Sequence, residues 1–99
     1  MPGPARRETV IRIRNDVVFR ELEGEMVLLN LTTGVYFGLD ALGTRIWRLI
    51  DGQRSAADIV ATLTAEYEVD AGTCGADLAR FLETLRDNEL VERADEPVR

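Results

Sequence analysis

The sequence contains no histidine, no lysine and a single cysteine, Cys74. Without histidine it lacks the commonest general base and nitrogen metal ligand, and it has no Ser-His or Cys-His nucleophile pair. One cysteine cannot form an internal disulfide. Carboxylates alone can run acid–base chemistry, but no carboxylate pattern indicates a cleft with perturbed acids. We therefore expect no catalytic residue, no metal and no cofactor, with a small carboxylate enzyme left as an alternative.

Long apolar runs are also missing. None approaches the ~20 residues that a membrane span requires, and no apolar segment follows the charged start of the chain as it would in a signal peptide. We expect a cytoplasmic protein with no membrane partner. The length of 99 residues suits one domain with one modest core.

Charge is unevenly distributed along the chain, whose net charge is −6. Residues 1–20 carry five arginines and two acids, whereas residues 21–99 carry seven arginines and sixteen acids. An acidic body repels phosphate backbones and attracts basic partners. The charge therefore argues against a nucleic-acid partner and favours a basic polypeptide.

Three β-prone segments, residues 17–22, 26–31 and 35–39, are separated by short turns and predict an antiparallel meander. Residues 9–14 are also β-prone and could pair weakly. We expect residues 1–8 to form a flexible arm, residues 9–93 to form a single domain and residues 94–99 to form a frayed tail.

The periodicity then becomes helical. Asp40 is a good N-cap for a first helix, and Ser55 with Asp58 resembles a capping box that opens a second one. A third helix is expected to start near Thr73, after a break at residues 69–72, and to close at Asn88 in the left-handed conformation. Its apolar stripe consists of Leu78, Phe81, Leu82 and Leu85.

The order of these elements predicts an α+β fold, in which a three-stranded antiparallel sheet is followed by a three-helix, winged-helix-like bundle. Such a small sheet is stable only when one face is covered, and the helices supply that cover. Trp47 is expected in the core, and Cys74 is expected to be semi-buried.

The order and spacing of these pieces resemble the PqqD-like family, also called RiPP recognition elements (RiPP, ribosomally made and modified peptide). The matching residues are Leu28 to Asp40, Gly43, Ile46 to Gly52, Ile59-Val60, Leu63, Tyr67, Asp77-Leu78, Phe81-Leu82, Leu85 and Leu90-Val91. The resemblance implies a domain that binds the leader segment of a precursor peptide as an added strand on its third strand, against its third helix.

Within that family, Gly34 to Leu39 followed by Ile46-Trp47 is most similar to the stand-alone leader-binding proteins of lasso-peptide pathways. Pyrroloquinoline quinone proteins usually carry Pro-Glu-Gly near the second turn, where this chain has Thr32-Thr33-Gly34. Many members have glycine before the final apolar pair, where this chain has Glu89. We expect Asn88 to take over that cap.

The first candidate site is the third strand, with Val35, Tyr36, Phe37 and Gly38 as peptide-binding residues. The segment has no charge and no proline, so it lacks the usual protection of an edge strand against pairing. Gly38 would let a second backbone approach closely. The alternative is a simple third strand whose aromatic side chains fill the core.

The second candidate site lies on the third helix. Asp77, Arg80, Phe81 and Thr84 share one face by their spacing and could form the wall of the peptide cleft. The alternative is that Phe81 belongs to the core and the other three are solvated, and the two roles can coexist for Phe81.

We therefore predict a non-catalytic protein that binds a lasso-type precursor leader and delivers it to a leader protease and the cyclase. Alternatives are a PqqD-type chaperone that presents a precursor to a radical SAM enzyme, and a winged-helix transcription regulator. The third helix argues against the regulator, because two arginines and three acids between residues 73 and 88 make a poor groove reader.

Overall fold

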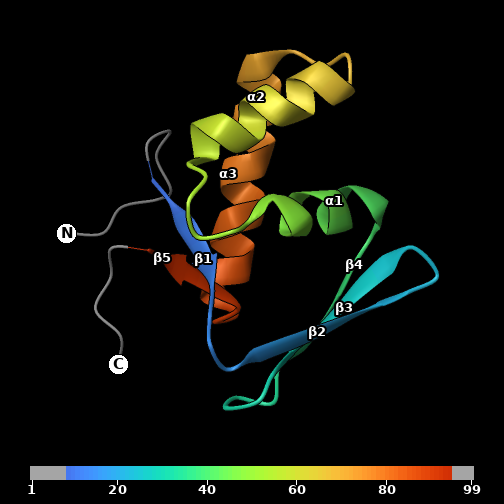
Figure 1. Cartoon of the computed structure of the whole chain (residues 1–99), viewed down its shortest axis with the longest axis vertical. Helices are drawn as coiled ribbons and strands as arrows, with labels where there is room; N and C mark the ends of the chain where they lie inside the picture. Colours follow the sequence, from blue (N-terminus) through green and yellow to red (C-terminus); the bar gives the residue numbers. More distant parts are fainter. Residues whose placement is uncertain (1–8, 95–99) are drawn as a thin grey trace.

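The computed structural model describes residues 9–94 (Figure 1). The predicted arm, residues 1–8, and residues 95–99 of the predicted tail lie outside this range. Ala94, the first residue of that tail, is described, and its backbone N–H donates to the Val10 carbonyl at 2.8 Å. No helix in the described range is long and apolar enough to cross a membrane. The elements are β1 (Ile11–Ile13), β2 (Val17–Leu22), β3 (Glu25–Asn30), β4 (Tyr36–Leu39), α1 (Ala41–Leu49), α2 (Ala56–Glu66), α3 (Ala71–Asp87) and β5 (Val91–Arg93).

The predicted α+β fold, with a three-stranded antiparallel sheet and three helices, is confirmed. The sheet has the order β2-β3-β4, and Leu28 at its centre lies opposite Phe19 on β2 and Phe37 on β4. Helix α1 covers one face of this sheet (Figure 1). Its Trp47 is 1% exposed and meets Phe19 edge-to-face, with ring centroids 5.4 Å apart. The expectation of a core tryptophan is thereby confirmed.

A second, two-stranded sheet joins the two ends of the described chain. β1 and β5 pair antiparallel, with Ile13 opposite Val91, and Arg12 Nε donates to Glu92 Oε2 at 2.6 Å across the pair. Residues 9–14 therefore do pair, and the chain after α3 becomes a strand. Figure 1 shows this small sheet beside the lower half of α3.

The helix starts follow their capping side chains. Ser55 and Asp58 form the reciprocal capping box expected for α2. The predicted start of α3 near Thr73 is wrong by two residues, since the helix begins at Ala71. The carboxylate of Asp70 accepts the Thr73 N–H at 2.9 Å and caps the helix before Gly72, so this glycine lies in the first turn instead of breaking the helix.

The end of α3 also differs from the prediction. Asn88 has φ −90°, and the left-handed residue is Glu89, with φ 59°. The N–H groups of Leu90 and Glu89 donate to Leu85 and Arg86, both at 2.9 Å, in the Schellman pattern. Glutamate at position 89 thus adopts the left-handed backbone that closes the helix.

Candidate peptide-binding site

β4 forms an edge of the three-stranded sheet, and its hydrogen bonds run to β3 on one side. Two contacts show which of its residues face β3. Asn30 N–H donates to the Val35 carbonyl at 2.9 Å. At the other end, the Thr44 hydroxyl accepts Met26 N–H at 2.9 Å and donates to the Leu39 carbonyl at 3.4 Å. Bonded pairs alternate along an antiparallel ladder, so every second residue of β4 points its backbone groups away from β3.

The residues that point outwards are Tyr36 and Gly38, whereas Phe37 and Leu39 face β3. No other strand within residues 9–94 pairs with this outer edge. Tyr36 and Gly38 therefore present N–H and C=O groups in the spacing that an added strand requires. Sequence reasoning found this segment but not which of its residues carry the free groups.

The side chains of β4 alternate between the two faces of the sheet. Tyr36 is 69% exposed and Gly38 is exposed, whereas Phe37 is half-buried against the core and Leu39 is buried. The alternative in which the aromatics fill the core therefore applies to Phe37 alone. An added Cβ at Gly38 would meet no atom within 4 Å, so the free fold does not require glycine there.

A cavity of about 390 Å³ lies where β4 ends and α1 begins. Its walls come from the first half of α1, the end of α2 and the first two-thirds of α3, and they are mainly apolar. Leu42, Tyr67 and Val69 line it, although each is between 42% and 50% exposed. Large apolar side chains around an opening of this size are typical of a binding pocket.

The sheet edge and α3 meet at this cavity. An added Cβ at Gly43 of α1 would lie 3.3 Å from Leu39 Cβ and 3.4 Å from Phe81 Cζ. Glycine thus allows the start of α1 to pack between the end of β4 and the middle of α3. A Cβ at 43 would fit only if these neighbours moved by a few tenths of an ångström.

The four predicted residues of α3 separate into two groups. Asp77 and Phe81 line the cavity, together with Thr73 and Leu78. Arg80 and Thr84 are exposed and are not among its lining residues. Arg80 forms an ion pair with Asp77, and the Thr84 hydroxyl donates to the Arg80 carbonyl at 3.0 Å. The α1 and α2 contributors, such as Leu42 and Tyr67, were not among the predicted peptide-binding residues, because their place beside α3 arises only in the folded chain.

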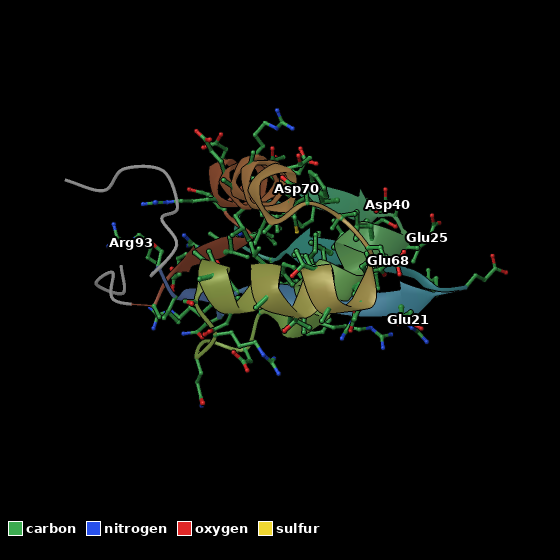
Figure 2. All side chains as sticks on the ribbon, turned by 90° about the horizontal axis from the view of Figure 1, so that it is seen from above. Glu21, Glu25, Asp40, Glu68, Asp70 and Arg93 are labelled. Carbon is green, nitrogen blue, oxygen red and sulfur yellow. The ribbon has the colours of Figure 1, made fainter. Side chains whose placement is uncertain are left out.

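Two carboxylates, those of Asp40 and Asp77, line the cavity. In Figure 2, Asp40, Glu68, Glu25 and Glu21 lie towards one end of the molecule and Arg93 lies at the other. Asp40 also caps α1 by accepting the Gly43 N–H at 2.8 Å. This opening favours a partner that combines apolar and basic side chains.

Cys74 contributes a half-buried thiol to the cavity wall. Burial, followed by the negative charge of Asp77, raises the pKa of this thiol. The thiol is therefore neutral at physiological pH and a weak nucleophile. Its position agrees with the expected semi-buried residue. Within residues 9–94 no group of three side chains is placed to hold a metal ion.

The fold and the site define a class, a small α+β domain whose sheet ends in an open strand beside an apolar cavity. The family model described as Coenzyme PQQ synthesis protein D (PqqD) matches residues 25–91. The chain therefore belongs to the PqqD family, as the sequence motifs indicated.

Three relatives show what the chain is similar to. A "PqqA binding protein" of Rhodopseudomonas palustris (strain HaA2) is 37% identical over 57 residues, which are 58% of this chain. That match spans just over half, 56%, of the curated relative. The structure "TbiB1 in Complex with the TbiA(beta) Leader Peptide" superposes with a TM-score of 0.77 and 46% identity, over 82% of this chain and 94% of the other.

The structure "Lasso peptide synthetase B1 complexed with the leader peptide" has a TM-score of 0.76 and 28% identity, over 84% of this chain and 98% of the other. Both of these similar structures contain a leader peptide. They agree with the expected similarity to the leader-binding proteins of lasso-peptide pathways.

Proposed function

We propose that this chain binds the leader segment of a ribosomally made, lasso-type precursor peptide. The leader adds to the sheet as a strand on β4. The observation that carries the proposal is the outward-facing backbone of Tyr36 and Gly38, which runs towards the cavity between α1, α2 and α3. The two similar structures, each complexed with a leader peptide, support the same conclusion.

Affinity and specificity come from different parts of the site. Strand pairing to β4 supplies hydrogen bonds that do not depend on the leader sequence, and pockets for alternate side chains select among peptides. The cavity accepts an apolar side chain of the leader, with Leu42, Tyr67 and Val69 around it. The carboxylates of Asp40 and Asp77 favour a basic residue beside that side chain. Arg80 and Thr84 contact the leader farther along α3.

The chain makes and breaks no bond in this role. It delivers the bound precursor to the leader protease of the same pathway and to the cyclase. Holding a substrate beside its enzyme raises the effective concentration without new chemistry. The absence of histidine from the sequence and the neutral thiol of Cys74 support a binding role.

A direct test uses two peptides and two readouts. A fluorescent synthetic leader peptide of the lasso type, such as the TbiA(beta) leader bound to the 46%-identical structure, should bind saturably, as measured by anisotropy, and a scrambled leader of equal composition should not. Incubation of the full precursor with the purified chain should leave the peptide mass unchanged. Absence of saturable binding would contradict leader recognition, and a cleaved or modified peptide would contradict the binding-only role.

The curated relative favours one second candidate, presentation of a PqqA-type precursor to a radical SAM enzyme. The observation behind it is the 37% identity to a PqqA-binding protein. The same anisotropy assay separates the two, since a lasso-type leader and a PqqA-type peptide can compete for the chain. Tighter binding of the PqqA-type peptide would favour this second candidate.

A further inference from the structure

We infer that Asn30 is the positioning residue of the leader site, because it holds β4 at a set distance from the end of α3. These two elements are the walls between which the leader lies, so the inference rests on the proposed function. Asn30 is the last residue of β3 and is 0% exposed. It therefore acts on the leader through the walls that it joins and not by contact.

The side chain of Asn30 makes hydrogen bonds in two directions. Its Oδ1 accepts the N–H groups of Thr32 at 2.8 Å and Thr33 at 2.9 Å. Its Nδ2 donates to the Glu89 carbonyl at 2.6 Å, across 59 positions of sequence. A buried amide needs such partners, because a polar group left unsatisfied inside the fold is costly. One side chain thus connects the turn before β4 to the chain after α3.

The bonds to the turn determine where β4 begins. The Asn30 carbonyl accepts the Gly34 N–H, and the Asn30 N–H donates to the Val35 carbonyl, both at 2.9 Å. Asparagine side chains commonly organise turns by accepting a backbone N–H two residues ahead. Gly34, with φ 78°, supplies the left-handed conformation that this turn needs. The path of Tyr36, the first outward-facing residue of β4, therefore follows from Asn30.

The bond to Glu89 holds the end of α3 against this turn. Glu89 has the left-handed φ of 59°, and the next N–H, that of Leu90, donates to Leu85 at 2.9 Å. This closure of the helix fixes the direction of the Glu89 carbonyl, which Asn30 Nδ2 meets. The β3–β4 turn and the C-terminal end of α3 are therefore joined by a hydrogen bond whose donor residue is buried.

A second contact joins the same two elements at the other end of β4, where Gly43 lies between Leu39 and Phe81. An extended chain from Val35 to Leu39 covers about 13 Å. The helical turns from Phe81 to Glu89 cover about 12 Å. The two walls thus match in length and are joined near both ends. Walls of this length flank about four residues of an extended peptide.

Loss of the bond to Glu89 leaves the groups that contact the leader in place but frees the walls to move apart. An added strand lies about 4.8 Å from β4, so its side chains must fit the space that remains up to α3. Binding to mobile walls has to order them as well, which lowers affinity, whereas preorganised walls avoid this cost. Leader affinity should therefore depend on Asn30 although this residue is buried.

The test removes the donor to Glu89 and keeps an acceptor for the turn. In Asn30→Ser a hydroxyl oxygen, and in Asn30→Asp a carboxylate oxygen, can still accept N–H groups of the turn. Ile59→Val is the control, because Ile59 is 0% exposed on α2, does not line the cavity, and loses core packing when truncated. Two quantities are measured for each variant. They are the thermal unfolding midpoint and the dissociation constant of the labelled TbiA(beta) leader peptide, at a temperature well below that midpoint.

We expect Asn30→Ser to weaken leader binding about tenfold, since the walls lose their preorganisation. Asn30→Asp should weaken it further at neutral pH, because a carboxylate oxygen then faces the Glu89 carbonyl. Ile59→Val should lower the unfolding midpoint yet leave leader affinity within about twofold, since both walls stay joined. A merely structural role for Asn30 would make its variants behave as Ile59→Val does.

Acid separates the bond to Glu89 from the bonds to the turn. When the carboxyl of Asn30→Asp is protonated it becomes a donor and can bond to the Glu89 carbonyl again. Its leader affinity relative to the wild type should therefore recover as pH falls, while the relative affinity of Asn30→Ser stays constant. The charged side chains around this corner are the same in all three proteins and cancel in the comparison. They are Arg14, Asp16, Glu89 and Glu92.

Wild-type leader affinity in both Asn30 variants would overturn the inference. So would an equal loss in Ile59→Val, because a general loss of stability would then explain all three results. An Asn30→Asp affinity that does not recover in acid would also overturn it, since the bond to Glu89 would then not set leader affinity. Asn30→Ser buries no charge, so it carries the test if Asn30→Asp does not fold. Failure of the unmodified chain to bind the leader is a different result, which overturns the proposed function first.

Discussion

The two edges of the three-stranded sheet differ in how readily a peptide could add to them as a strand. β2 carries Arg20 and Glu21, and Glu21 forms an ion pair with Arg48 of α1. β4 carries no charge and no proline. Charged side chains on an edge strand discourage pairing with other chains, and β4 lacks this protection. Both edges are unpaired within residues 9–94, and the comparison teaches that only the β2 edge carries charges that oppose strand addition.

The surroundings of the two edges differ as well. β4 leads through Asp40 into the cavity against α3, whereas no residue of β2 lines that cavity. A peptide on β4 can therefore pair its backbone and bury a side chain. A peptide on β2 would obtain the backbone bonds alone.

Proline substitution on β4 should give the largest effect on leader affinity and tests most clearly whether the two edges differ. Tyr36→Pro removes an outward N–H, so leader affinity should fall about a hundredfold while the fold remains. Phe37→Pro removes a backbone hydrogen bond to β3 and should destabilise the fold by about 1–3 kcal/mol. Anisotropy with labelled leader and thermal unfolding of both variants distinguish the two outcomes. Unchanged leader binding by Tyr36→Pro would remove β4 from the site.

The matched substitution on β2, Glu21→Pro, tests whether the charged edge takes part in leader binding. Leu31 N–H donates to the Asp16 carbonyl at 2.8 Å, which sets the alternation on this side and turns the backbone of Glu21 outwards. Glu21→Pro should leave leader affinity unchanged within about twofold, since proline is tolerated where an edge N–H faces solvent. A loss as large as that of Tyr36→Pro would mean that the leader uses β2.

The cavity should contribute less than the strand edge. Leu42→Glu places a charge on the cavity wall in the first turn of α1, where acidic residues are favourable, so the fold should persist. Leader affinity should fall about tenfold because an apolar pocket gains a charge. Leu31→Glu, at a 63% exposed position away from the cavity wall, is the control and should bind normally. Equal losses for both variants would indicate a general charge effect.

The sequence predicts those elements of the fold whose residue pattern recurs over several positions. The three strands of the meander were found because alternation and turn residues recur, and the Asp40 and Ser55 caps because they precede apolar periodicity. The pairing of β1 with β5 was underestimated, since each strand has three residues and Arg12 meets Glu92 across 80 positions of sequence. Such contacts depend on the folded core.

The candidate site also has a part that the sequence predicts and a part that it does not. The open strand was found because an uncharged β-prone segment is a local signal. The cavity was not predicted, because its walls come from three helices that meet only in the folded chain. The left-handed Glu89 was missed because its conformation is imposed by the Schellman bonds around it, against the preference of glutamate.

Salt should weaken leader binding modestly. The carboxylates at the cavity attract a basic leader, and this attraction is screened, whereas strand pairing and apolar burial are screened much less. We expect leader affinity to fall about threefold between low and high salt. Titrations at several salt concentrations measure the slope, and a flat response would exclude the acidic opening from leader capture.

The smallest expected effect concerns the acid stability of the contact between α1 and α2. Glu66 on α2 accepts a hydrogen bond from Arg45 Nε on α1 at 2.9 Å, and this bond lowers the pKa of the Glu66 carboxyl. A lowered folded-state pKa stabilises the fold above the ordinary carboxyl value, and this contribution is lost as pH falls through the folded pKa. Glu66→Gln should therefore lower the unfolding midpoint slightly near neutral pH and make no difference in strong acid.

The most direct test of the central claim is amide hydrogen exchange of the chain with and without bound leader. Tyr36 and Gly38 on β4 should gain protection, while Phe19 and Glu21, the outward-facing residues of β2, should exchange as they do in the free chain. Protection gained at Phe19 and Glu21, with none at Tyr36 and Gly38, would contradict the assignment of β4 as the open edge.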